Sequence, residues 1–190
     1  VGNPIHDAIR QIAHQTGVHF SIDVTINREH DITSVYAGEL FATHKAACEV
    51  AKRAAMRAVP EPFEIVLTTN SGFPLDLNLY QAVKGMSAAT QVVRDGGSVI
   101  CAAECSDGVP DDGEYKAILS EADGPRQLLD MICAPGYNRH DQWQVQIQAQ
   151  IQLRARVYLK SGRLEPQQVR AAHLEPVDDV SSTVSQVLRE

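Results

Sequence analysis

The hydrophobic pattern of the first 37 residues predicts a helix followed by a hairpin. Apolar residues recur at helical spacing between Asn3, a favourable N-cap before a proline, and Gly17, a common helix stop. Apolar and polar residues then alternate over 18–26, the period of a half-buried strand, and a shorter strand is expected over 32–37. The polar turn between these two segments indicates an antiparallel pair.

The next segment, 39–57, is rich in alanine and predicts a second helix. Two prolines, Pro60 and Pro62, follow it, and proline stops helices and stiffens linkers. We therefore expect two parts in the chain: a helix–hairpin–helix unit over 1–58 and an α/β domain over 59–190.

From residue 63 onward strands and helices alternate, which favours an α/β fold around a mixed, partly parallel sheet. Val99, Ile100 and Cys101 form a continuous apolar run, as in a parallel strand buried on both faces. Residues 142–153 fit either a glutamine-rich helix or a strand, because their apolar residues also alternate. The remaining expected elements are strands at 63–67, 98–103 and 156–160, a turn at Gly96-Gly97, and helices at 77–94, 113–121, 125–133 and 177–189.

The loop after the strand at 63–67 is the best candidate for a binding site. In an α/β domain, ligands bind at the loops that leave the carboxyl ends of strands. The helix after this loop places Tyr80, Gln81 and Lys84 on one face, because positions three and four apart are neighbours. A phenol, an amide and an ammonium could together hold a small anion such as a carboxylate. An ordinary solvated helix face beside an ordinary turn would explain the same residues.

One long motif covers this candidate site: Pro74-Leu75-Asp76-Leu77-Asn78-Leu79-Tyr80-Gln81-Ala82-Val83-Lys84-Gly85-Met86. Shorter motifs flank it in a fixed order: Gly2-Asn3-Pro4, Ala37-Gly38-Glu39, Val59-Pro60-Glu61-Pro62, Gly96-Gly97-Ser98-Val99-Ile100 and Glu104-Cys105-Ser106-Asp107-Gly108. Together these motifs resemble the C-terminal part of the nickel-dependent lactate racemase family over most of the chain. Ser71 and Phe73 stand where the family more often has Gly and Tyr, which leaves the substrate open.

The resemblance implies a racemase or epimerase of 2-hydroxy acids that works through a nickel-pincer nucleotide. In this chemistry the cofactor takes the C2 hydrogen as a hydride, a histidine removes the hydroxyl proton, and the protein orients the substrate. Gln81 and Lys84 match positions that contact substrate, with Lys84 on its carboxylate. Lactate, malate, larger hydroxy acids and sugar acids all share that carboxylate end.

Other residues are secondary candidates for the same cleft. Tyr80 neighbours the two matched positions, and the loop residues Asn70, Ser71 and Gly72 lead into them. Trp143 could form an apolar wall, although a tryptophan in such a segment is more often buried in the core.

The family's catalytic histidines, its cofactor-bound lysine and its nickel-ligating histidine lie in an N-terminal half that has no counterpart here. We therefore expect this chain to be a C-terminal portion of a larger enzyme, truncated at its end and inactive on its own. The nickel-pincer nucleotide would be bound mainly outside it, and we expect none in the portion alone. Residues 1–58 would pack on the missing half, with motion about 58–62.

Composition narrows the set of partners. The net charge of −7, with no block of lysine and arginine, argues against a nucleic-acid partner. A hydrophobic fraction of 44% is ample for a core, and no apolar stretch is long enough to span a membrane. The expected partners are a small 2-hydroxy acid and the missing half of the same enzyme.

The cysteines and histidines do not form a metal or disulfide pattern. The four cysteines include no Cys-x-x-Cys pair, so we expect a cytoplasmic protein in which Cys48 and Cys101 are small buried hydrophobes. The seven histidines lack metal spacing and are expected to be surface or structural residues. The acidic loop 107–114 lacks the EF-hand spacing, so a solvated loop is favoured over a calcium site.

Two functions from other classes fit the same residues. The chain could be a non-catalytic module that senses a small carboxylate, or a structural domain whose Tyr80–Lys84 face meets a protein partner. The first would bind a carboxylate tightly on its own and would need no nickel-binding half in the same protein. In the second, loss of Lys84 would weaken association with the partner protein.

Overall fold

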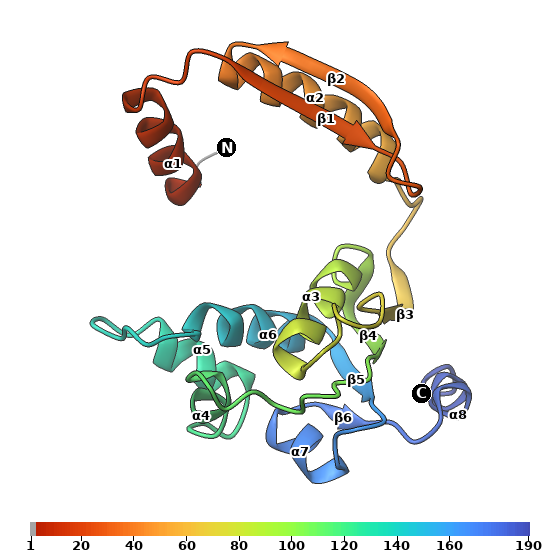
Figure 1. Ribbon diagram of the computed structural model, residues 1–190. Helices are drawn as coiled ribbons and strands as arrows, with labels where there is room; N and C mark the ends of the chain where they lie inside the picture. The colour runs from red at the N-terminus through yellow and green to blue at the C-terminus, as the bar shows by residue number, and fades with distance from the viewer. Residues whose placement is uncertain (1–2) are drawn as a thin grey trace. The chain divides into compact units, whose positions relative to one another are not determined.

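The computed structural model describes residues 3–190, and the chain divides into two compact units that meet at Ala58 and Val59. The first unit is a helix, a hairpin and a second helix, as expected (Figure 1). Its first helix begins after Asn3, whose side-chain oxygen accepts hydrogen bonds from two backbone N–H groups of the first turn. The elements are α1 (Pro4–Gln15), β1 (Ser21–Ile26), β2 (Ile32–Gly38) and α2 (Leu40–Ala55).

The hairpin strands pair antiparallel, and α2 lies along one of their faces (Figure 1). The face with half-buried residues carries Ser21, Asp23 and Thr25, whereas the alternating apolar residues of β1 are exposed. The strand prediction is confirmed, and the half-buried side of the strand is its polar one. Cys48 is also exposed rather than buried, because α2 turns Thr43, Ala47 and Val50 inward instead.

The second unit is built on a four-stranded sheet in the order β3-β4-β5-β6, and every neighbouring pair is parallel. The antiparallel pair of the first unit forms a sheet of its own. The strands are β3 (Phe63–Thr69), β4 (Val93–Ala102), β5 (Arg156–Lys160) and β6 (Glu175–Pro176). The helices are α3 (Leu79–Ala89), α4 (Tyr115–Leu119), α5 (Pro125–Ile132), α6 (Gln142–Arg154), α7 (Pro166–Ala171) and α8 (Val180–Val187).

Side chains from β4 and β5 alternate between two cores, one on each face of the sheet. Cys101 and Leu159 pack into the main core, which residues of α3, α4, α5 and α6 complete. Ile100 and Tyr158 point to the other face, where the valines of α8 pack against them. The prediction that Val99–Cys101 is buried on both faces is therefore confirmed.

The largest differences from the predicted boundaries lie between α3 and β4. The helix expected over 77–94 ends at Ala89, and Val93 already lies fully buried in β4. The expected turn at Gly96-Gly97 lies inside β4, at an irregularity in its pairing with β3. Gly97 is required there, because a Cβ would sit 2.7 Å from the Glu64 carbonyl oxygen.

The segment between β5 and α8 holds two elements that the hydrophobic pattern did not reveal, α7 and β6. A capping box between Glu165 and Gln168, with Pro166 at the first helical position, marks the start of α7. The ambiguous segment 142–153 is a helix. In the part of the chain that the structure describes, no helix is both long and apolar enough to cross a membrane.

Candidate functional site

The loop from β3 to α3 is tied to the helix that follows it. The side-chain amide of Asn70 donates to the Gln81 carbonyl oxygen at 3.0 Å and also to the Leu75 carbonyl oxygen. Ser71 and Gly72 both adopt left-handed backbone, with φ of 64° and 76°, and so form a tight turn. Asn70 thus holds the turn against the first part of α3.

Gly85 lets α3 approach the end of β3. A Cβ at this position would lie 2.7 Å from the Thr69 carbonyl oxygen and 3.3 Å from the Asn70 Cα, too close for any other residue without movement. The helix face that carries Gln81 and Lys84 is therefore placed directly beside the carboxyl end of the strand.

A second loop, which follows β4, locks the same region. The buried Asp76 carboxylate accepts a hydrogen bond from the Glu104 N–H at 2.9 Å, and its backbone oxygen accepts one from the Cys105 N–H at 3.0 Å. Asp107 donates its N–H to the Leu77 carbonyl oxygen at 2.8 Å. The sequence motifs at 74–86 and 104–108 thus form one structure, at the carboxyl end of the parallel sheet.

Gln81 and Lys84 are in direct contact. The Lys84 Nζ donates to the Gln81 Oε1 at 2.6 Å. Because an ammonium has no acceptor, this bond fixes which end of the amide faces the lysine. The Gln81 NH₂ group and the remaining N–H groups of Lys84 are then hydrogen-bond donors at the surface of α3, where Lys84 is exposed and Gln81 half-buried. Asn78 caps the helix by accepting from the Gln81 N–H at 3.1 Å.

Tyr80 lies in an aromatic cluster. Its ring meets Tyr115 at 5.4 Å and Trp143 at 5.8 Å between ring centroids, both edge to face. Gln144, fully buried on α6, donates its side-chain N–H to the Tyr80 carbonyl oxygen at 2.6 Å. Burial, and next the charge of Asp141, raise the pKa of Tyr80, so its hydroxyl stays protonated at neutral pH.

Trp143 is 50% exposed, so the expectation of a buried core tryptophan is wrong. The next two residues of α6, Gln144 and Val145, take the buried positions instead. Polar side chains of this helix therefore face the protein core, which was not predicted from the sequence. Glutamine recurs at every second position from 142 to 152, and the three that are four apart, Gln144, Gln148 and Gln152, share one helix face.

A polar pocket of about 220 Å³ opens beside Tyr80 and Gln81. Its other side is made by residues that the sequence analysis did not single out as a site, namely His140 and Asp141, with Asp112 from the acidic loop. Asp141 is half-buried, with a left-handed backbone (φ 64°), and its carboxylate accepts from the Glu114 N–H at 3.1 Å. A Cβ at Gly113 would collide with that carboxylate, so a larger residue here would displace the Asp141 side chain.

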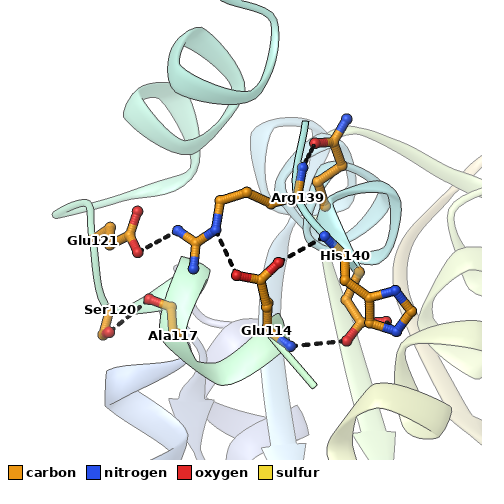
Figure 2. A network of polar contacts seen from close by, with 8 residues as sticks. Glu114, Ala117, Ser120, Glu121, Arg139 and His140 are labelled. Carbon is orange, nitrogen blue, oxygen red and sulfur yellow. Dashed lines mark hydrogen bonds and ion pairs between the residues drawn. The ribbon is translucent and has the colours of Figure 1, made fainter. Parts of the chain in front are cut away.

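Arg139 holds this side of the pocket in place. Figure 2 shows its guanidinium between Glu114, at 2.9 Å from Nε to Oε1, and Glu121. The other oxygen of Glu114 accepts from the His140 N–H at 2.7 Å (Figure 2). Hydrogen bonding to Arg139 lowers the pKa of Glu114. One residue of the acidic loop is thus an ion-pair partner, and the loop is not simply solvated.

One of the predicted loop residues, Gly72, lies at a different hollow. Gly72 lines a space of about 380 Å³ at the carboxyl edge of the sheet with Asp76, Ala103 and Lys160, apart from the Tyr80–Gln81 pocket. A substrate-binding role of Asn70, Ser71 and Gly72 remains a prediction, as does that of Tyr80, Gln81 and Lys84.

The titratable groups that could hold a metal are dispersed. Within residues 3–190, no group of three or more His, Cys, Asp or Glu side chains is arranged so that it could hold a metal ion. Burial raises the pKa of the Cys101 thiol to about 12 and that of the Cys105 thiol to about 11, so both stay protonated. The described residues by themselves do not fit a nickel centre.

The chain is similar in sequence to known proteins over most of its length. Residues 59–189 match the model of the lactate racemase C-terminal domain. The chain is 34% identical over 185 residues to a lactate racemase of Thermoanaerobacterium thermosaccharolyticum, covering 96% of this chain and 43% of that protein. It is 35% identical over 176 residues to a lactate racemase of Lactiplantibacillus plantarum, covering 91% of this chain and 41% of that protein.

The same similarity is seen in three dimensions. The solved lactate racemase apoprotein of T. thermosaccharolyticum superposes with a TM-score of 0.87 at 30% identity, over 99% of this chain and 45% of that one. A Thermotoga maritima protein shares the fold, with a TM-score of 0.60 at 13% identity, over 92% of this chain and 46% of that one. The chain spans less than half the length of the curated relatives that it matches.

Proposed function

The chain belongs to the lactate racemase family through its C-terminal domain, and on this premise we propose that it binds the carboxylate end of a 2-hydroxy acid for a racemase or epimerase. The observation that carries the proposal is the contact between Lys84 and Gln81. The lysine supplies a positive charge, and the amide, held by its oxygen, supplies N–H donors beside it. A carboxylate accepts both, and charge-assisted bonds of this kind are the stronger ones.

The remaining parts of the reaction belong to the longer protein. The full enzymes of this family use a nickel-pincer nucleotide, which supplies the hydride chemistry at C2. We place that cofactor, and the groups that move the hydroxyl proton, outside this chain. The role of this chain is to hold the carboxylate so that C2 has a fixed position. The 190-residue chain alone is then inactive, and lactate is the first substrate to test because the relatives are lactate racemases.

Direct binding tests the proposal without any cofactor. Lactate is titrated into the 190-residue chain, and ¹⁵N NMR follows the α3 amides. Lys84→Ala should weaken binding roughly ten- to hundredfold, the range for one charge-assisted hydrogen bond. Gln81→Glu keeps the size and the bond to Lys84 but places an anion where the N–H donors were, so binding should be lost. Lys116→Ala, at an exposed lysine on α4, is the matched control and should bind as the parent does.

Catalysis is tested in the natural protein that carries this chain, loaded with its nickel cofactor. A single-enantiomer 2-hydroxy acid deuterated at C2 should invert with the label retained, and Lys84→Ala should abolish the inversion. If the chain binds the acid but no 2-hydroxy acid is inverted, a carboxylate-sensing module becomes the better explanation. If Lys84→Ala changes neither binding nor inversion, the proposal is wrong.

A further inference from the structure

The pocket beside Tyr80 and Gln81 is lined by hydrogen-bonding groups that the methyl group of lactate could not use. Loops that are distant in sequence contribute the carboxylates of Asp112 and Asp141 and the imidazole of His140. From α3 it receives the phenol of Tyr80 and the amide of Gln81. We propose that this pocket binds the hydroxyl groups of a polyhydroxylated 2-hydroxy acid, that is, a sugar acid. The inference rests on the carboxylate site proposed above.

The pocket lies where the carbon chain of such an acid would run. Gln81 belongs both to the Lys84 contact and to the pocket, so one residue joins the two sites. An α-helix rises about 1.5 Å per residue, which puts Tyr80 roughly 6 Å from Lys84 along the axis of α3. An acid anchored at Lys84 and pointing toward the start of α3 therefore carries its distal carbons into the pocket.

The donors and acceptors match hydroxyl groups. The Asp112 and Asp141 carboxylates accept hydrogen bonds, and the Tyr80 hydroxyl, kept protonated, can donate or accept. Within residues 3–190, neither the Tyr80 hydroxyl nor the Asp112 carboxylate has a hydrogen-bond or ion-pair partner, so both are available. A pocket built from hydrogen-bonding groups rejects an analogue that lacks the matching hydroxyls more strongly than an apolar pocket rejects one methylene.

The negative charge of the pocket disfavours a ligand that carries a second carboxylate. Two carboxylates line it, and His140 lies against one of them, 3.4 Å from Asp141. A diacid such as malate would bring a like charge to these carboxylates, which is unfavourable. A neutral, hydroxylated chain meets no such repulsion. The pocket therefore separates sugar acids from both diacids and lactate.

The walls are fixed before a ligand arrives. Asp141 is held by the Glu114 N–H, and the backbone of His140 by the Glu114 carboxylate, which Arg139 in turn holds (Figure 2). The three bonds join residues that are 27, 26 and 25 positions apart in the chain. A preformed polar pocket loses little conformational freedom when it binds, and so can discriminate between ligands.

Binding of three probes tests the inference. Gluconate, lactate and malate are titrated into the 190-residue chain, with the indole N–H of Trp143 as reporter. Trp143 is the one tryptophan of the sequence, and its ring meets that of Tyr80 edge to face. Gluconate should bind roughly tenfold or more tightly than lactate, the effect of one additional charged hydrogen bond, and malate should bind no better than lactate.

Substitution locates the effect in the pocket. Asp112→Ala should bring the ratio of lactate to gluconate dissociation constants close to one. Asp111→Ala removes the same charge one residue away, at a position outside this pocket, and should keep the parent ratio. In the nickel-loaded natural protein, kcat/KM for the two acids should follow the same ratios.

The possible failures differ from one another. If gluconate and lactate bind equally and Asp112→Ala changes nothing, while Lys84→Ala still weakens both, the pocket does not read hydroxyls and the carboxylate site survives. If no acid binds the parent chain, both the carboxylate site and the pocket proposal are wrong. Equal loss of the ratio in Asp111→Ala and Asp112→Ala would also overturn the inference, because it would reflect the charge of the loop alone.

Discussion

The two units of the chain treat the apolar residues of their strands in opposite ways. In the second unit the apolar side chains of β4 and β5 are buried on both faces, under helices of the same unit. In the first unit, Thr43 is the one buried residue among 3–58. Large aliphatic residues of α1 and of the hairpin, namely Ile9, Ile22 and Val24, are exposed by 47% or more.

This difference shows that an apolar stripe identifies a face to be covered, and not what covers it. A sheet that turns polar residues toward its own helix and apolar residues outward has little driving force to fold alone. The apolar side of the hairpin is exposed, and we infer that another part of a longer protein covers it. We propose that this part is the half of the family's enzymes to which the chain has no counterpart, in line with the length of its relatives.

Separating the units tests the comparison with the largest expected effect. Residues 59–190 should unfold cooperatively in urea, because the three buried clusters lie within them. Residues 1–58 alone should give no cooperative transition and should bind a hydrophobic dye. Circular dichroism and dye fluorescence at low protein concentration measure both. A cooperative, monomeric 1–58 would show that the hairpin needs no cover.

Gly85→Ala tests whether the second unit really positions the site. The new methyl group would lie 2.7 Å from the Thr69 carbonyl oxygen, so α3 must move away from β3. Overpacking of this kind costs about 1–3 kcal/mol in the free energy of unfolding. Urea unfolding measures it, and lactate binding should weaken in parallel because Gln81 and Lys84 move with the helix.

Gly124→Ala is the matched control. Its Cβ would meet nothing within 4 Å, and its backbone is extended, so unfolding and lactate binding should stay near the parent values. Equal stability of Gly85→Ala and Gly124→Ala would mean that the close approach of α3 to β3 is not required.

Much of the second unit could be predicted because its signals are local. The Val99–Cys101 run fixed a buried parallel strand, and the spacing of Gln81 and Lys84 placed them together. The first unit was predicted as elements but not as faces, because period-two alternation separates two faces without saying which one is covered. Cys48 was misplaced for the same reason, since its helix is covered on one side only.

The polar pocket could not be predicted because it depends on long-range pairing. Asp112 and Asp141 meet only when the Glu114–Arg139 ion pair joins their loops. No short motif contains these residues together. An isolated Asp or Arg in a loop is ordinarily solvated, so the sequence favoured that interpretation for the acidic loop.

Lowering the pH should weaken the contacts that hold the pocket together. We expect a smaller effect on stability than from separating the units or from Gly85→Ala. Hydrogen bonds from Arg139, then from the His140 N–H, hold the pKa of Glu114 below its ordinary value of 4.5. The unfolded chain therefore takes up the proton first. The contribution of Glu114 to stability is complete above pH 4.5 and is lost as the pH falls below it, through the pKa of the folded state.

Glu114→Gln isolates this contribution from other acidic groups. At pH 7 the variant should unfold at lower urea than the parent, and the difference between the two should shrink as the pH falls below 4.5, since the parent then carries a neutral side chain as well. The gluconate preference should decline over the same range, because Asp141 and His140 lose their common support. A difference in stability that is constant from pH 7 to pH 3 would mean that the Glu114 charge does not hold the pocket together. The second unit would then owe the geometry of its site to apolar packing alone, and the contrast with the first unit would reduce to the amount of surface that each buries.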